Sequence, residues 1–221
     1  MNGDRMLERL KEELAGDFTP VKALKEPWRK ALWIFPISLL FMAITLAIFG
    51  LRPDYANLGL IAFWGFCVAQ VLACYLAFTL SLEAVIPGRA KDPIVLAIIG
   101  LVALAIHFIA SWFTFRISPN WAAPGQELQT GMACLSAITI FGVLALLFGF
   151  YWARFCLPIR SGTAGILLGL GSGLAAEAAW RSHCPISSWD HVLPFHFGAI
   201  LVVMAAGWIG GYLWTKKKSH R

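Results

Sequence analysis

The sequence predicts an all-α polytopic membrane protein, a bundle of six transmembrane helices with both termini in the cytoplasm. Hydrophobic residues make up 59% of the 221-residue chain, and charged residues make up only 14%. Six apolar stretches approach the roughly 20 residues that a helix needs to cross the hydrocarbon of a bilayer. Lysine and arginine gather in alternate connections between those stretches, which is typical of proteins that obey the positive-inside rule.

The spans are expected where apolar residues run between polar or charged segments. In chain order, the six predicted spans cover residues 31–51, 58–82, 93–115, 131–153, 162–181 and 192–214. Fifteen of the 18 lysine and arginine residues then fall on one side of the membrane, and only Arg52, Arg116 and Arg181 fall on the other. This asymmetry places both termini in the cytoplasm. The formal net charge of +6 therefore reflects orientation, and we predict no direct binding to nucleic acid.

The segment before the first span is predicted to be a cytoplasmic arm. Leu7, Leu10 and Leu14 recur at helical spacing, and Gly16 is placed to end that helix. Two interpretations are open: the helix lies on anionic headgroups of the inner leaflet, or it fills a groove on a cytosolic partner. The predicted domains are an arm over residues 1–30, a transmembrane domain over 31–215 and a basic cytoplasmic tail over 216–221.

The fifth and sixth predicted spans carry glycines at four-residue spacing. Gly165, Gly169 and Gly173 lie in the fifth span, and Gly207 and Gly211 lie in the sixth. Small residues at this spacing let helix backbones approach closely inside a membrane. We therefore expect these two spans to pack tightly.

Residues that bind metals or react with oxidants gather at the outer ends of spans four to six. The predicted topology brings them to one membrane depth, on the side away from the cytoplasm. Two thiols with imidazoles form a ligand set that suits copper as Cu(I), zinc or cadmium, and carboxylates can complete the shell. No cofactor is required by this prediction, and a regulatory metal ion is the expected ligand. The predicted metal or redox-sensing residues are Cys134, Glu177, His183, Cys184, His191 and His196.

Alternatives are open for several of these residues. In an oxidising compartment, Cys134 and Cys184 can form a disulfide that joins the start of the fourth span to the loop after the fifth. Glu177 can instead make an interhelical hydrogen bond. His196 is expected inside the bilayer, where a buried imidazole needs a partner, whereas His191 can be exposed to solvent.

The sequence lacks the motifs of several common enzyme classes. HExxH, GxSxG, Walker A and a strand-to-helix GxGxxG do not occur. Charged residues do not line a route through the centre of the bundle, as they do in many transporters. We therefore predict that the protein is not an enzyme.

Four short pieces occur in a fixed order along the chain. They read DFTPVKAL at residues 17–24, GMACL at 131–135, HCP at 183–185 and HxxxxH at 191–196. With these pieces in this order around six spans, the chain resembles the NrsF family (negative regulator of SigF), six-span membrane anti-sigma factors of Proteobacteria, along essentially its whole length.

The resemblance implies an anti-sigma factor of the bacterial inner membrane that holds an extracytoplasmic-function sigma factor inactive. Cys134 and Cys184 would be the pair that responds to heavy-metal stress, and the arm would contact the sigma factor. No oligomeric state is implied. The alternative is a membrane metal-handling or redox protein that uses the same cluster and whose arm only anchors it. The residues expected to contact the partner are Leu7, Leu10, Leu14, Asp17, Pro20, Val21 and Leu24.

Overall fold

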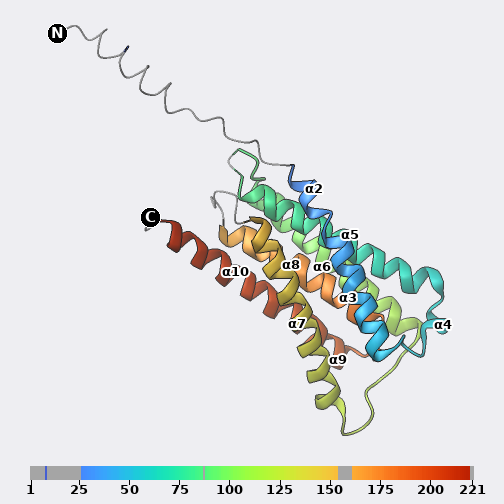
Figure 1. The fold of residues 1–221 in the computed structure, drawn as a ribbon. Coiled ribbons are helices and arrows are strands. Elements are labelled where there is room, and N and C mark those ends of the chain that lie inside the picture. The colour runs from blue at the N-terminus through green and yellow to red at the C-terminus, as the bar shows by residue number, and fades with distance from the viewer. Residues whose placement is uncertain (1–7, 9–25, 87, 154–160, 220–221) are drawn as a thin grey trace.

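The computed structural model describes residues 8, 26–86, 88–153 and 161–219, and the regular elements in these ranges are all helical. Figure 1 shows the long helices packed side by side. The elements are α2 (Pro27–Ala31), α3 (Ile34–Phe49), α4 (Tyr55–Leu58), α5 (Leu60–Ala84), α6 (Pro93–Ile117), α7 (Glu127–Ala153), α8 (Ser161–Arg181), α9 (Trp189–His191), the π-helix η1 (Val192–Phe197) and α10 (Gly198–Ser219).

Six helical stretches among the described residues are long and apolar enough to cross a membrane, which confirms the predicted all-helical fold with six candidate spans. They correspond one to one to the six predicted spans. These stretches are Pro27–Phe49, Phe63–Ala84, Pro93–Ile117, Glu127–Ala153, Ser161–Arg181 and Trp189–Trp214.

The helices extend beyond several of the predicted spans. The first stretch begins at Pro27, because proline suits the first helical turn, where its missing N–H is not needed. Helix α7 begins at Glu127, four residues before the predicted span, and α10 continues to Ser219 through the basic residues of the predicted tail. Hydropathy marks the part of a helix that matches the hydrocarbon, so it does not mark where polar residues continue the helix into the interface.

Helix α8 forms the centre of the bundle (Figure 1). In its apolar stretch 83% of the residues are buried, compared with 22% to 50% in the other five stretches. It packs most extensively against α10, α5 and α7. Helix α8, which supplies Glu177 and leads into Cys184, is therefore the most deeply buried of the six stretches.

Glycines allow α8 and α10 to touch backbone to backbone. A Cβ atom at Gly165 would clash with the carbonyl oxygen of Gly207, and one at Gly211 would clash with the carbonyl oxygen of Ser161. At Gly169 an added Cβ would lie only 2.7 Å from the Cα atom of Met204. The tight packing predicted from the glycine spacing is confirmed, and it fixes how the helix that carries His196 sits on α8.

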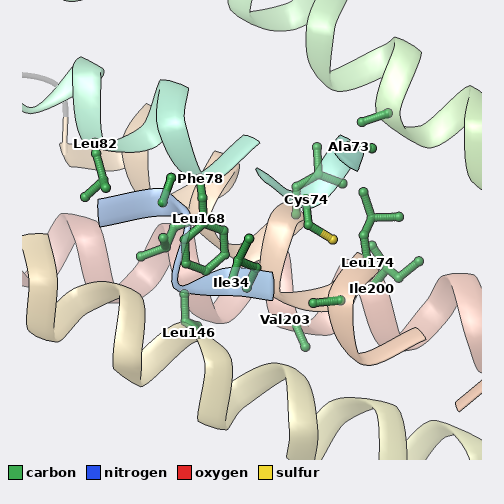
Figure 2. Close-up of a cluster of buried hydrophobic side chains, with 14 of the residues drawn as sticks. Ile34, Ala73, Cys74, Phe78, Leu82, Leu146, Leu168, Leu174, Ile200 and Val203 are labelled. Atoms are coloured by element: carbon green, nitrogen blue, oxygen red, sulfur yellow. The ribbon is translucent and has the colours of Figure 1, made fainter. Parts of the chain in front are cut away.

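A buried apolar cluster ties the start of the first span to α5 and α8. Ala31 and Ile34 are buried against Phe78 and Leu82 of α5. Figure 2 shows Phe78 and Ile34 close to Leu168 of α8 at the centre of this cluster. The chain just after the predicted arm is thus held firmly by the core.

A salt bridge reinforces this attachment at the same end of the bundle. The guanidinium of Arg89, in the connection between α5 and α6, donates to both carboxylate oxygens of Glu26 at 2.6 and 3.0 Å. Hydrogen bonds from Arg89 hold the pKa of the Glu26 carboxyl below its ordinary value. Both side chains are exposed, so this pair contributes little to stability.

The two ends of the bundle differ in what they carry. Helix α2 and the last turns of α10 lie at one end, and α4 and α9 lie at the other (Figure 1). We call the second one the site end. It is formed by the connections 50–59, 118–126 and 182–188.

Candidate metal centre

Four buried side chains meet at the site end of the bundle. Cys134 comes from the second turn of α7, Cys184 from the connection after α8, His191 from α9 and His196 from η1. Their ligand atoms all lie within 4.8 Å of one another. Segments far apart in the sequence thus bring two sulfurs and two ring nitrogens to one point.

Two of the separations in this cluster match those of a tetrahedral metal site. The Cys134 and Cys184 sulfurs are 3.7 Å apart, and the Cys184 sulfur lies 3.6 Å from Nε2 of His191. A tetrahedral zinc ion, with bonds of about 2.3 Å to sulfur and about 2.05 Å to nitrogen, requires separations of about 3.8 and 3.6 Å. The two sulfurs, and the Cys184 sulfur with Nε2 of His191, are therefore already spaced as ligands of such an ion would be.

The π-helix η1 explains how two histidines five residues apart reach the same site. In an α-helix, with about 3.6 residues per turn, residues five apart point about 140° away from each other. The i→i+5 pattern of a π-helix instead places the fifth residue nearly above the first. His191 lies directly before η1 and His196 within it, and their ring centroids are 5.2 Å apart. Pro194, which cannot donate a helical hydrogen bond, lies between them.

Each histidine keeps one buried ring nitrogen without a hydrogen-bond partner among the described residues. These atoms are Nδ1 of His191 and Nε2 of His196. The other nitrogen of His196, Nδ1, lies 3.4 Å from Oε1 of Glu177. Nε2 of His196 is therefore the nitrogen available to the cluster. Leaving a buried polar atom unpaired costs free energy, and a metal ion in the cluster would give Nε2 of His196 a partner. In His191 it is Nε2, and not the unpaired Nδ1, that faces the Cys184 sulfur.

A buried ion pair holds the connection that carries Cys184. Arg52 donates to the two carboxylate oxygens of Asp54 at 2.6 and 2.8 Å, and both residues are nearly inaccessible, at 2% and 8% exposed. The backbone N–H of Arg52 donates to the carbonyl of Ser182, and its guanidinium donates to the carbonyl of Pro185 at 3.2 Å. The chain on both sides of Cys184 is therefore fixed by Arg52.

Further hydrogen bonds join the Asp54 carboxylate to the connection between α6 and α7. Ser118 and Asn120 donate to Asp54 Oδ2 at 2.7 and 3.0 Å. The carbonyl of Asn120 accepts the backbone N–H groups of Ser187 and Ser188. Burial would raise the pKa of the Asp54 carboxyl, but hydrogen bonds from Arg52 and Ser118 outweigh it, so that the pKa lies below its ordinary value. The carboxylate stays charged and keeps these connections together.

Glu177 lies beside the cluster and is the centre of a buried polar network. Arg181, one helical turn along α8, contacts its Oε1 at 2.7 Å. Gln70 of α5 donates to its Oε2, and Nδ1 of His107 in α6 lies 3.6 Å from the same oxygen. With His196, four residues from four helical segments surround one carboxylate. The hydrogen bond that the sequence left open for Glu177 is present, and Glu177 is not one of the four clustered side chains.

His183 occupies a different place at the site end. Its Nδ1 lies 3.1 Å from the carbonyl oxygen of Gly50, and its ring contacts Phe49 and Trp180. The structure therefore does not bring it to the four-residue cluster. His191, in contrast, is 3% exposed, so the solvent-exposed position that the sequence left open for it is wrong.

Sequence reasoning missed the residues that support the cluster. Arg52 and Arg181 were read only as charges of outer connections, yet both are buried. The four-residue spacing of Glu177 and Arg181 on one helix was a usable signal. Gln70 and His107 offered a weaker signal, because each is a lone polar residue inside an apolar span.

The predicted partner-contacting residues fall in the arm, which lies outside the described residues. They remain predictions from the sequence. These residues are Leu7, Leu10, Leu14, Asp17, Pro20, Val21 and Leu24.

Similarity to known proteins covers most of the chain. The family described as NrsF, negative regulator of sigma F, matches residues 14–216. The anti-sigma-F factor NrsF of Caulobacter vibrioides (strain NA1000 / CB15N) is 28% identical over 119 residues, which make up 52% of this chain and 56% of that protein. The chain thus spans about half the length of this curated relative. No solved structure matches the chain.

Proposed function

The chain belongs to the NrsF family of negative regulators of sigma F, and we propose that it holds an extracytoplasmic-function sigma factor inactive at the bacterial inner membrane. The arm, residues 1–30, is the proposed contact with sigma. Its apolar residues repeat at helical spacing, as in peptides that bind a groove on a partner. It joins directly to Ala31 and Ile34, which are buried in the core.

We place both termini in the cytoplasm, where a sigma factor works. Helix α2 and the last turns of α10 lie at the same end of the bundle (Figure 1), and Arg89 binds Glu26 at this end. The site end carries Arg52 and Arg181, both of which are neutralised by a buried carboxylate. The basic end therefore faces the cytoplasm, in accord with the positive-inside rule, and the site end faces the periplasm.

The signal proposed for release is a heavy-metal ion bound at the site end. The observation that carries this proposal is the buried group of two thiols and two imidazoles within 4.8 Å of one another. Thiolate and imidazole ligands select Cu(I), Zn(II) or Cd(II) over hard ions such as Mg²⁺. When bound, such an ion would link α7, the connection after α8, α9 and η1 through its four ligands.

Thiol oxidation is the second signal that the same cluster supports. The Cys134 and Cys184 sulfurs lie 3.7 Å apart. A two-electron oxidant that removed two electrons and two protons would join them, which requires the sulfurs to approach to about 2.05 Å. Metal binding and disulfide formation compete for the same two sulfurs, so each would prevent the other.

The signal would reach the arm through packed helices. His196 at the site end contacts Glu177 of α8, and Glu177 in turn accepts a hydrogen bond from Gln70 of α5. Phe78 and Leu82 of α5 pack on Ala31 and Ile34, which follow the arm. To move an equilibrium from 1:99 to 99:1, the signal must favour one packing by about 5.5 kcal/mol. A few metal–ligand bonds can supply this difference.

Affinity capture from the native host tests the sigma contact. We expect the full-length protein in detergent to bring down one extracytoplasmic-function sigma factor, and the protein lacking residues 1–30 to lose it. Mass spectrometry identifies what is captured. If neither form brings down a sigma factor, the membrane metal-handling or redox alternative takes its place.

Cysteine substitution tests the sensing half of the proposal. We expect Cys134→Ser and Cys184→Ser to abolish the transcription that heavy metals induce. Cys67→Ala is the matched control, because Cys67 is buried in α5, away from the cluster, where its thiol donates to the backbone carbonyl of Ala178 at 3.8 Å. An unchanged metal response in both serine variants would refute sensing at this cluster.

A further inference from the structure

We propose that Glu177 is the positioning residue of the metal centre, the carboxylate that orients His196 so that its Nε2 atom faces the two thiols. This inference rests on the function proposed above, since it requires that the four-residue cluster bind a metal. In this inference Glu177 orients a metal ligand and is not itself a ligand of the ion.

The contact between the two side chains has the arrangement of a carboxylate–histidine–metal triad. Nδ1 of His196 lies 3.4 Å from Oε1 of Glu177, and Nε2 has no other hydrogen-bond partner among the described residues. A ligating histidine donates its second N–H to a carboxylate in many metal sites, which fixes both the tautomer and the ring plane. The proton therefore belongs on Nδ1, and Nε2 keeps the lone pair that a metal needs.

Both oxygens of Glu177 are already engaged by other groups. Oε1 contacts Arg181 and His196, and Oε2 contacts Gln70 and His107. Cys134, Cys184 and the two clustered histidines supply the four ligands of a tetrahedral shell without it. A direct bond from Glu177 to the ion would have to displace Arg181 or one of the other donors.

The cost of keeping this carboxylate buried points to a specific role. Glu177 is fully buried and its partner Arg181 is 6% exposed, inside a helix that is otherwise apolar over this stretch. A buried ion pair of this kind contributes little net stability compared with apolar residues of similar size. Ionisable residues retained within a membrane span are functional by default. Of the contacts that Glu177 makes, the one with Nδ1 of His196 connects it to the metal-binding cluster.

The test compares variants that separate the carboxylate from the ion pair. Replacing Glu177 alone would leave Arg181 buried without its charge partner, and replacing Arg181 alone would do the same to Glu177, so the double variant E177M/R181M is compared with the wild type. Methionine is at most a weak acceptor for the Nδ1–H of His196, whereas the side-chain oxygen of glutamine would still accept it. E177D is a second variant, because it retains the charge beside Arg181 and withdraws the carboxylate from His196 by one methylene. Glu83→Gln is the matched control, since Glu83 lies on α5 near the opposite end and contacts Lys91.

The probe is Co(II), titrated into the full-length detergent-solubilised protein against a chelator. We expect Glu83→Gln to bind Co(II) as the wild type does within about threefold, and E177M/R181M and E177D to bind it about 10- to 100-fold more weakly. The thiolate-to-cobalt absorption band should persist in all of them, because both sulfurs remain. Histidine ¹⁵N NMR should show the Nδ1–H form of His196 in the wild type and its loss in E177M/R181M.

Two results would overturn the proposal in different ways. If E177M/R181M and E177D bind Co(II) as tightly as the wild type, the positioning role is refuted while the metal centre stands. If the wild type shows no cysteine-dependent binding of Co(II), Zn(II) or Cd(II), the metal half of the proposed function is refuted together with this inference.

Discussion

Neutralising Asp54 should loosen the connection that holds Cys184, and the size of the effect follows from the contacts of Arg52. The variant Asp54→Asn removes the charge partner of a guanidinium that is only 2% exposed. Breaking a buried ion pair by removing one partner costs about 3–5 kcal/mol. With about 1.36 kcal/mol for each factor of ten, local opening of this region should become at least about 10²-fold more frequent.

Hydrogen exchange read by mass spectrometry measures this opening. The backbone N–H groups of Ser187 and Ser188 donate to the carbonyl of Asn120, and that of Arg52 donates to Ser182. Peptides that contain these three amides should therefore exchange at least about 10²-fold faster in Asp54→Asn. Affinity for Co(II) should fall as well, because the position of Cys184 is no longer fixed.

The matched control is Asp92→Asn. Asp92 caps the start of α6 at the other end of the bundle by accepting from the N–H of Ile94 at 2.7 Å. Asparagine caps a helix nearly as well as aspartate, so exchange should hardly change at either end. If Asp54→Asn leaves the exchange of residues 182–188 as slow as in the wild type, the ion pair does not hold this connection and the reasoning fails.

Three further predictions follow from the same structure. Because the pKa of Asp54 is lowered in the folded protein, its contribution to stability is complete above about pH 4, the unfolded value, and is lost as the pH falls through the folded value. Hydrogen exchange of residues 182–188, corrected for intrinsic rates, should therefore rise in the wild type as the pH falls below that range and stay flat in Asp54→Asn. Gly165→Ala should destabilise the bundle by about 1–3 kcal/mol and lower its thermal unfolding temperature in detergent, because the added methyl meets the Gly207 carbonyl, whereas Gly65→Ala, with open space at that position, should not. Finally, aspartate in place of three leucines of the arm should abolish sigma capture while membrane insertion, read by fractionation, is retained; capture that survives would contradict the arm as the contact, and the three leucines are Leu7, Leu10 and Leu14.

The metal cluster shows how far reasoning from residue types reaches. Two thiols and two imidazoles were assigned to one depth of the membrane from topology alone, and the structure does bring those four side chains together. His183 was grouped with them because it is adjacent to Cys184 in the sequence. The turn after α8 points it instead to the carbonyl of Gly50, since neighbouring residues outside a regular helix share no common direction.

The spacing of His191 and His196 could not be interpreted from the sequence. In an α-helix a spacing of five residues points the two side chains in different directions. The π-helical turn that aligns these two histidines depends on how the chain around Pro194 packs against α7 and α10. The same limit applies to Arg52 and Asp54. Their charges looked like those of any outer loop, and only the approach of residues 182–188 buries them.

The sequence by itself determined the six spans, the close packing of α8 on α10 and the ligand types gathered toward one end. Each of these depends on composition or periodicity along one segment, which hydrophobic length and helical spacing encode locally. The tertiary structure alone decided which side chains share a site. In it, His183 lies outside the cluster and Glu177 contacts the far ring nitrogen of His196. Gln70, His107 and Arg181 surround the carboxylate of Glu177. Those contacts depend on the rotation and depth of four helical segments relative to one another, which are set by packing across the whole bundle.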